Sequence, residues 1–193
     1  MNMLTTLTYL SAIGGVVALI YAVILAVRIN KMDSGTKKMK EIAQSINEGA
    51  KAFLFSEYKI LVIFVATVFV VISVCGIITK SDVLNYRTAL AFLIGAILST
   101  LAGYCGMSVA TKANVRTANA AKEKGMNSAL STAFSGGAVM GMCVSGLGLL
   151  GVCLIYALTG DDNILFGFSL GASSIALFAR VGGGIYTKAA DVG

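Results

Sequence analysis

Hydrophobic residues occur in five long runs, which are separated by short charged segments. The runs without a charged residue cover 1–27, 60–79, 88–111, 125–160 and 163–179. A spanning helix needs roughly 20 apolar residues, because the hydrocarbon layer is about 30 Å thick and each helical residue rises about 1.5 Å. We therefore predict five spanning helices, over about 4–27, 58–79, 88–111, 129–158 and 164–191.

The composition indicates the same class of protein. Of the 193 residues, 57% are hydrophobic and 12% are charged, whereas soluble domains carry about 25% charged residues. A chain inside the bilayer must satisfy its backbone amides internally, so runs of this length are expected to be helical. The predicted fold class is all-α, a polytopic transmembrane helical bundle in a single transmembrane region. The first run lacks the basic segment that precedes a secretory signal, and we expect it to be retained as a span.

Basic residues are concentrated in the first and third connections between the predicted spans. They are Arg28, Lys31, Lys37, Lys38, Lys40, Lys51 and Lys59 in the first, and Lys112, Arg116, Lys122 and Lys124 in the third. Basic residues gather in cytoplasmic loops. We therefore predict a multi-pass protein of the cell membrane with its N-terminus outside. The net charge of +6 reflects this topology, and because the charges are dispersed, no nucleic-acid partner is expected.

The first basic connection contains a predicted cytoplasmic amphipathic helix over about 36–54. Its apolar residues recur at three- and four-residue spacing: Met39, Ile42, Ile46, Ala50 and Phe53. This is the period of a helix with one apolar face. It could lie on the membrane surface or extend the second span into the cytoplasm. We favour the extension, because Glu48 and Glu57 dilute the basic face that lipid binding requires.

Small residues form ridges in the third and fourth spans. Gly95, Ser99 and Gly103 are four residues apart in the third span, and Gly137, Gly141 and Ser145 repeat this spacing in the fourth. Small residues at this spacing let helix backbones approach closely inside the bilayer. We predict that both ridges are packing surfaces.

Candidate chemistry lies at the end of the chain, where three glycines stand among charged residues. If one helix runs unbroken through this end, Ser173, Arg180, Gly184, Lys188 and Asp191 share one face at about 100° per residue. Lys188 and Asp191 would lie roughly 12 Å and 16 Å beyond Arg180. This geometry suggests a charged constriction near Arg180 and a phosphate-and-metal type of site beyond it.

Ordinary roles for these residues are the alternative. Arg180 could be an anchor at a helix end, and Lys188 with Asp191 could be an exposed helix pair. Three consecutive glycines favour a site, because each destabilises a helix by roughly 0.8–1 kcal/mol. The sequence contains no histidine, so catalysis would have to use carboxylates, lysine or arginine. The four cysteines all lie in apolar runs without CxxC spacing and are interpreted as packing residues.

The segment from Arg180 to Gly193 resembles the signature of the membrane-bound, ion-translocating inorganic pyrophosphatases. It reads Arg-Val-Gly-Gly-Gly-Ile-Tyr-Thr-Lys-Ala-Ala-Asp-Val-Gly. Three earlier segments are similar to the same family: 39–43, 49–54 and 113–116. The resemblance covers essentially the whole chain, but only about the first quarter of a family member.

The resemblance implies a sixteen-helix homodimer that hydrolyses pyrophosphate at the cytoplasmic face and moves H+ or Na+ outward. It implies that Lys188 binds phosphate oxygens of the substrate and that Asp191 ligates Mg2+. Arg180 would belong to the coupling gate, and Ser173 would affect ion transport. Mg2+ is the implied cofactor, with K+ left open as an activator. Pyrophosphate is dense in negative charge, which lysine and Mg2+ can neutralise.

The family's pattern continues beyond Gly193 with further acidic residues. One carboxylate cannot hold several magnesium ions, so we assign no catalytic residue within the chain and expect these 193 residues alone to be inactive. Two other function classes stay open: a non-enzymatic helical membrane scaffold, and a small anion transporter that uses Arg180 and Lys188. The scaffold explains the small-residue ridges, but it does not explain a lysine and an aspartate beyond a triple glycine.

Overall fold

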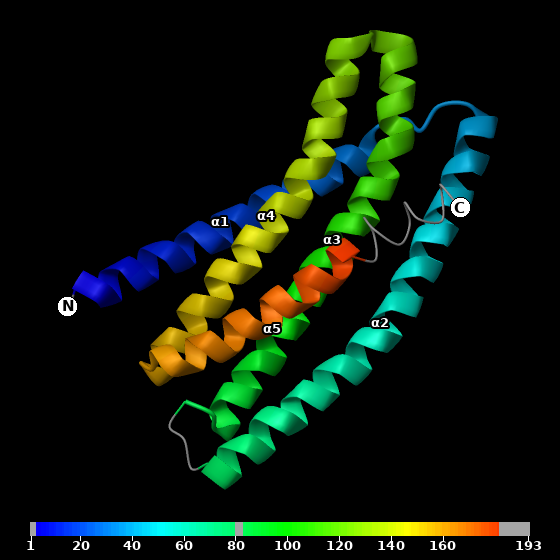
Figure 1. Ribbon diagram of the computed structural model, residues 1–193. Helices are drawn as coiled ribbons and strands as arrows, with labels where there is room; N and C mark the ends of the chain where they lie inside the picture. The colour runs from blue at the N-terminus through cyan, green and yellow to red at the C-terminus, as the bar shows by residue number, and fades with distance from the viewer. Residues whose placement is uncertain (1–2, 80–82, 182–193) are drawn as a thin grey trace.

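Five α-helices make up nearly all of the part that the computed structural model describes, residues 3–79 and 83–181 (Figure 1). They are α1 (Met3–Lys31), α2 (Lys37–Thr79), α3 (Tyr86–Lys124), α4 (Met126–Thr159) and α5 (Asp162–Arg180). The described ranges contain no strand. All five helices are long and apolar enough to cross a membrane. The predicted all-α, polytopic helical fold is confirmed.

Local chemistry accounts for several helix ends. Asn85 precedes α3, and its side-chain oxygen accepts hydrogen bonds from the backbone N–H groups of Arg87 and Thr88 at 2.9 and 3.0 Å. Such a cap satisfies N–H groups that have no partner inside the helix. Gly125, between α3 and α4, has a φ of 79°, which favours glycine. Gly160 ends α4 in the left-handed conformation, and Asp161 caps α5 through the N–H of Asn163 at 2.9 Å.

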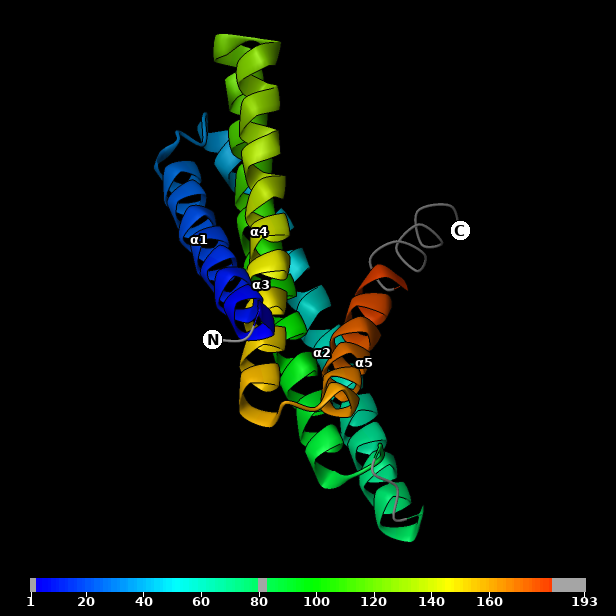
Figure 2. The same ribbon diagram turned by 90° about the vertical axis from the view of Figure 1, so that its left-hand side faces the viewer.

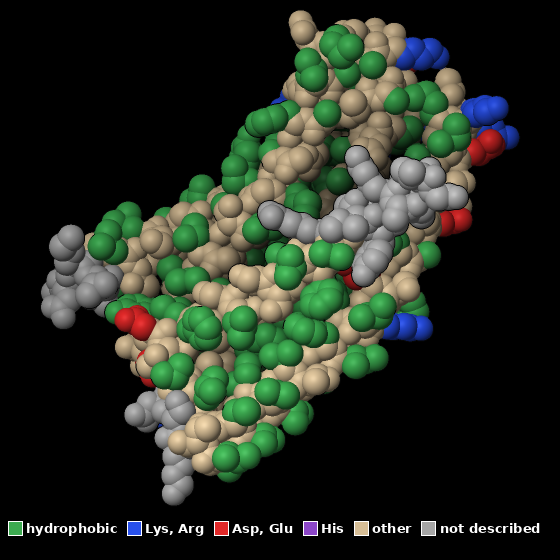
Figure 3. Space-filling model, in the orientation of Figure 1, with side chains coloured by type: hydrophobic (Ala, Val, Ile, Leu, Met, Phe, Trp, Pro, Cys, Tyr) green, Lys and Arg blue, Asp and Glu red, His purple; other side chains and the backbone are tan. Residues whose placement is uncertain are grey.

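Two of the helices continue far beyond their apolar runs. α2 is one helix from Lys37 to Thr79, so the segment 36–54 and the predicted span 58–79 are continuous. α3 continues through its charged residues to Lys124, and α4 begins two residues later. The α3–α4 hairpin and the start of α2 therefore lie at the same end of the molecule (Figures 1 and 2). We call this the basic end, because the lysines of both connections gather there (Figure 3).

α3 is the centre of the bundle, since it contacts each of the other four helices. Ala102 and Ala113 of α3 pack with Leu25 of α1 and Cys143 of α4. Separate clusters join α3 to α2 through Ile72 and Phe92, and join α2, α3 and α5 through Leu61, Ala96 and Ile175. By contrast, only 11% of the most apolar window of α2 is buried. The outer side of α2 therefore faces away from the described bundle.

The small-residue ridges of α3 and α4 behave differently. Gly95 and Ser99 of α3 contact α5, as described below. In α4, a side-chain carbon added at Gly137 or Gly141 would meet no described atom within 4 Å, whereas one added at Gly136 or Gly146 would press on a neighbouring helix. Within the described part, the predicted ridge of α4 therefore makes no close helix contact, and the adjacent face makes the contacts instead. Four-residue spacing identifies a face, but α4 carries small residues on more than one side.

Candidate functional site

The candidate site begins with α5, which is held against α3 by backbone contact. A carbon added at Gly171 would overlap the carbonyl oxygen of Phe92, and one added at Gly95 would overlap that of Phe168. The two helices can approach this closely only because both positions are glycine. The Ser99 hydroxyl donates a hydrogen bond to the Ala172 carbonyl at 3.0 Å. These contacts fix the height and the rotation of α5.

The opposite face of α5 is open. Ser173 is exposed, as are Phe166 at 58% and Leu177 at 62%. Residue 180 follows Ser173 by about two helical turns, and its backbone lies in the same helix. α5 therefore places residues 173 and 180 on one face, which no described helix covers.

The described end of α5 lies against α2 and remains helical. Ile175 is buried, and the Phe178 ring packs on the Phe64 ring with 4.7 Å between centroids. Val181 keeps right-handed helical angles, and its N–H bonds to the carbonyls of Leu177 and Phe178. The backbone thus does not turn away at Arg180. The predicted site residues Lys188 and Asp191 lie outside the described residues.

Glu57 places a carboxylate on the buried face of α2, near this end of α5. It lies three residues after Leu54 and four before Leu61, which are both buried, and so shares their side of the helix. Its neighbour Tyr58 packs in the same cluster as Phe178. The Glu57 Oε1 atom is buried without a hydrogen-bond partner among the described residues.

Burial raises the pKa of the Glu57 carboxyl, which lies just outside the predicted span 58–79, above its ordinary value. The sequence identified Glu57 only as an acidic residue that dilutes the basic face of the first connection. Its three- and four-residue spacing from two leucines is the signal that could have placed it on the buried face.

Arg116 fastens the end of α1 to α3. Its guanidinium donates hydrogen bonds to the carbonyls of Met32 at 3.1 Å and Asn30 at 3.3 Å, and to Lys112 of its own helix at 2.8 Å. Asn119, one turn further along, donates to the Asp33 carbonyl at 3.4 Å. Carbonyls at a helix end have no partner inside the helix, so these side chains complete the end of α1. The family-like segment 113–116 thus includes a structural residue whose partner the sequence did not identify.

The described residues do not form a metal centre on their own. No group of three or more His, Cys, Asp or Glu side chains comes together within residues 3–79 and 83–181. Mg2+ requires oxygen ligands in near-octahedral geometry, which this part of the chain does not provide. A magnesium site would need ligands from outside the described residues.

Comparison with known proteins places this architecture in context. The family described as inorganic H+ pyrophosphatase matches residues 16–193. A candidate K+-stimulated pyrophosphate-energized sodium pump of Clostridium tetani is 53% identical over 184 residues, which is 95% of this chain and 26% of the pump. The K+-insensitive pyrophosphate-energized proton pump of Methanosarcina mazei is 47% identical over 187 residues, 97% of this chain and 27% of the pump. The chain spans about a quarter of the length of these relatives.

Proposed function

The chain belongs to the inorganic H+ pyrophosphatase family, and we propose that it is the N-terminal part of a membrane-integral pump that couples pyrophosphate hydrolysis to outward movement of H+ or Na+. The relatives named above are pyrophosphate-energized pumps for sodium in one case and protons in the other. Family membership favours this function over the scaffold and the anion transporter.

One structural observation carries the proposal, namely the division of α5 into two faces. The face with Gly167 and Gly171 packs against α3. The face with Ser173 and position 180 is uncovered in the described part. A helix that lines an ion path must present polar groups on a face turned away from its packing partner. Intramembrane ionisable residues usually mark such paths. Segments of the full-length pump would cover this face and complete the site.

The roles of the four site residues follow from the family resemblance. Lys188 would bind phosphate oxygens of pyrophosphate and Asp191 would help to hold Mg2+, both beyond the described residues. Arg180 would act in the gate that couples hydrolysis to transport, and Ser173 would lie on the ion path. The backbone is still helical at Val181, one residue beyond the proposed gate position.

When bound, Mg2+ would neutralise negative charge on pyrophosphate and on the leaving phosphate. K+ stays open as an activator, because the sodium-pump relative is K+-stimulated and the proton-pump relative is K+-insensitive. The described residues contribute the scaffold that positions α5. The proposal also includes a homodimer, a cytoplasmic substrate site at the basic end and an external N-terminus. The concentration of lysines at the basic end supports that orientation.

Hydrolysis and transport measured on the full-length protein in membrane vesicles would test the proposal. We expect Mg2+-dependent release of phosphate from pyrophosphate, with uptake of H+ or Na+ into inverted vesicles. Lys188→Ala should abolish both activities, because a principal phosphate contact is lost. Lys124→Ala, at the exposed tip of the α3–α4 hairpin, is the matched control and should retain both.

The gate assignment has a separate test. Arg180→Ala should reduce ion uptake per phosphate released, since a gate residue controls the ion and not only the substrate. Normal uptake in this variant would contradict the gate role. Absence of pyrophosphate hydrolysis in the unmodified full-length protein would overturn the proposed function as a whole.

A further inference from the structure

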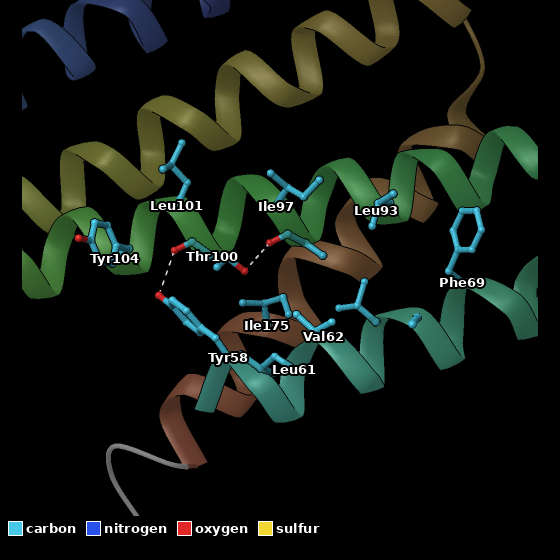
Figure 4. Close-up of a pocket in the computed structure, with 13 residues that line it drawn as sticks. Tyr58, Leu61, Val62, Phe69, Leu93, Ile97, Thr100, Leu101, Tyr104 and Ile175 are labelled. Carbon is cyan, nitrogen blue, oxygen red and sulfur yellow. Dashed lines mark hydrogen bonds between the residues drawn. The ribbon is translucent and has the colours of Figure 1, made fainter. Parts of the chain in front are cut away.

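α2 and α3 enclose an apolar groove of about 660 Å3 (Figure 4). α2 supplies one wall and α3 the other, while Ile175 of α5 lies between them at the back of the view. Apart from Tyr58, Thr100 and Tyr104, the residues that line the groove are hydrophobic. Since α5 lies behind it, the groove opens on the side of the bundle away from α5.

The groove has the length of one leaflet of a bilayer. On α2 it runs from Tyr58 to Phe69, and on α3 from Tyr104 back to Leu93. Each wall therefore extends for about 16 Å at the rise of a helix. Half of the hydrocarbon layer measures about 15 Å. Because Tyr58 begins the predicted second span, the groove covers the leaflet at the basic end.

The polar residues that line the groove are found only at its basic end, and a cation follows one of them in the sequence of α2. The Tyr58 hydroxyl donates to the Thr100 carbonyl at 3.3 Å and so joins the two walls there. Tyr104 is 50% exposed, and its hydroxyl has no hydrogen bond within the described part of the chain. On α2, the Lys59 ammonium lies 4.5 Å from the centroid of the exposed Phe55 ring, next to Tyr58. Tyrosine is enriched at the level of lipid headgroups.

We propose that this groove binds an anionic phospholipid of the leaflet at the basic end. One acyl chain lies along the walls between α2 and α3, and the phosphate lies near Lys59 and the Tyr104 hydroxyl. The length of the groove, its apolar lining and the location of the cation each fit this ligand. The inference is independent of pyrophosphate chemistry, because it concerns the face of the bundle opposite to the open face of α5.

Photo-crosslinking in the full-length protein tests the proposal. The photoreactive residue benzoylphenylalanine replaces Ile97, which lines the groove and is 55% exposed. The bilayer contains phosphatidylcholine with a minor fraction of phosphatidylglycerol. Mass spectrometry of the crosslinked peptide then identifies the captured molecule. The matched control carries the same residue at Ile20 of α1, which is also 55% exposed and does not line the groove.

At position 97 we expect phosphatidylglycerol adducts enriched about fivefold over their share of the bilayer, the effect of one lysine near an anionic headgroup. Lys59→Gln should reduce the enrichment to the bilayer ratio. Position 20 should capture both lipids in proportion to their abundance. Adducts at position 97 with a protein segment, or with the two lipids in the bilayer ratio, would overturn the proposal.

Discussion

Gly171→Ala is expected to separate α5 from α3 and thereby to destabilise the protein. The added carbon would overlap the Phe92 carbonyl oxygen and would stand 2.8 Å from its carbon and 3.0 Å from the Ala96 nitrogen. Ordinary contacts are about 3.5–4.0 Å. The neighbouring atoms are backbone and cannot rotate aside, so α5 must move away from α3 by about 1 Å at this point, by that same measure.

The energetic consequence follows from three contributions. Overpacking destabilises by about 1–3 kcal/mol. The same movement would lengthen the Ser99–Ala172 hydrogen bond from 3.0 Å to about 4 Å, with a loss of about 0.5–1.5 kcal/mol. Alanine stabilises a helix by about 1 kcal/mol relative to glycine. The net expectation is a loss of about 0.5–3.5 kcal/mol in the free energy of unfolding.

Gly148→Ala provides the matched control, because a carbon added there meets no described atom within 4 Å. It should leave stability unchanged or raise it by up to about 1 kcal/mol. The assay is thermal unfolding of both full-length variants in the same detergent, followed by loss of helical circular dichroism. In the proposed pump, a displacement of about 1 Å in α5 should also lower hydrolysis by about 100-fold. If both variants shift stability in the same direction by the same amount, the backbone contact between α3 and α5 is refuted.

Three further predictions concern α2 and α3. Arg116→Lys keeps the charge but loses the planar fork that reaches three carbonyls. We expect this variant to be destabilised by about 1–3 kcal/mol and trypsin to cleave its α1–α2 connection faster. The control Lys112→Ala should leave both the stability and the cleavage rate unchanged. Tyr58→Phe removes the hydrogen bond to Thr100 and should lower the free energy of unfolding by about 0.5–1.5 kcal/mol; no loss would contradict the contact. The pKa of Glu57 is raised in the folded protein. The contribution of this carboxyl to stability is therefore fully present below the pKa that it has in the unfolded chain, and it is lost as the pH rises through the pKa that it has in the folded protein. Glu57→Gln should therefore raise the melting temperature at neutral pH and change it little at low pH, and an unchanged difference across that range would contradict this sign.

The number of helices and their type could be predicted from the sequence because the bilayer imposes a minimum length. Each apolar run either reaches about 20 residues or it does not. The same criterion cannot locate helix ends outside the hydrocarbon. α3 continues to Lys124 through residues that hydropathy separates from the span. Its end is instead set by Gly125 and its positive φ, which is a conformational signal and not a hydrophobic one.

The candidate site could be predicted only in part, because a helical face is visible in sequence and its neighbour is not. Seven-residue spacing placed Ser173 and position 180 together, and α5 has this geometry. Nothing in the sequence identified α3 as the helix that covers the opposite face. For the same reason Glu57 was missed and the packing face of α4 was assigned to Gly137 and Gly141, whose neighbourhood is open.

The glycines of α5 explain how one helix can be firmly held and still present a free face. Inside a bilayer there is no hydrophobic drive for helices to associate, so van der Waals contact and hydrogen bonds must supply the attraction. Gly167 and Gly171 bring the α5 backbone directly against α3, and Ser99 adds a hydrogen bond to a carbonyl. A large side chain at either position would need a wider interface to hold α5 equally well. Close contact along a narrow stripe leaves the opposite face of α5, including Ser173, available for the proposed ion path.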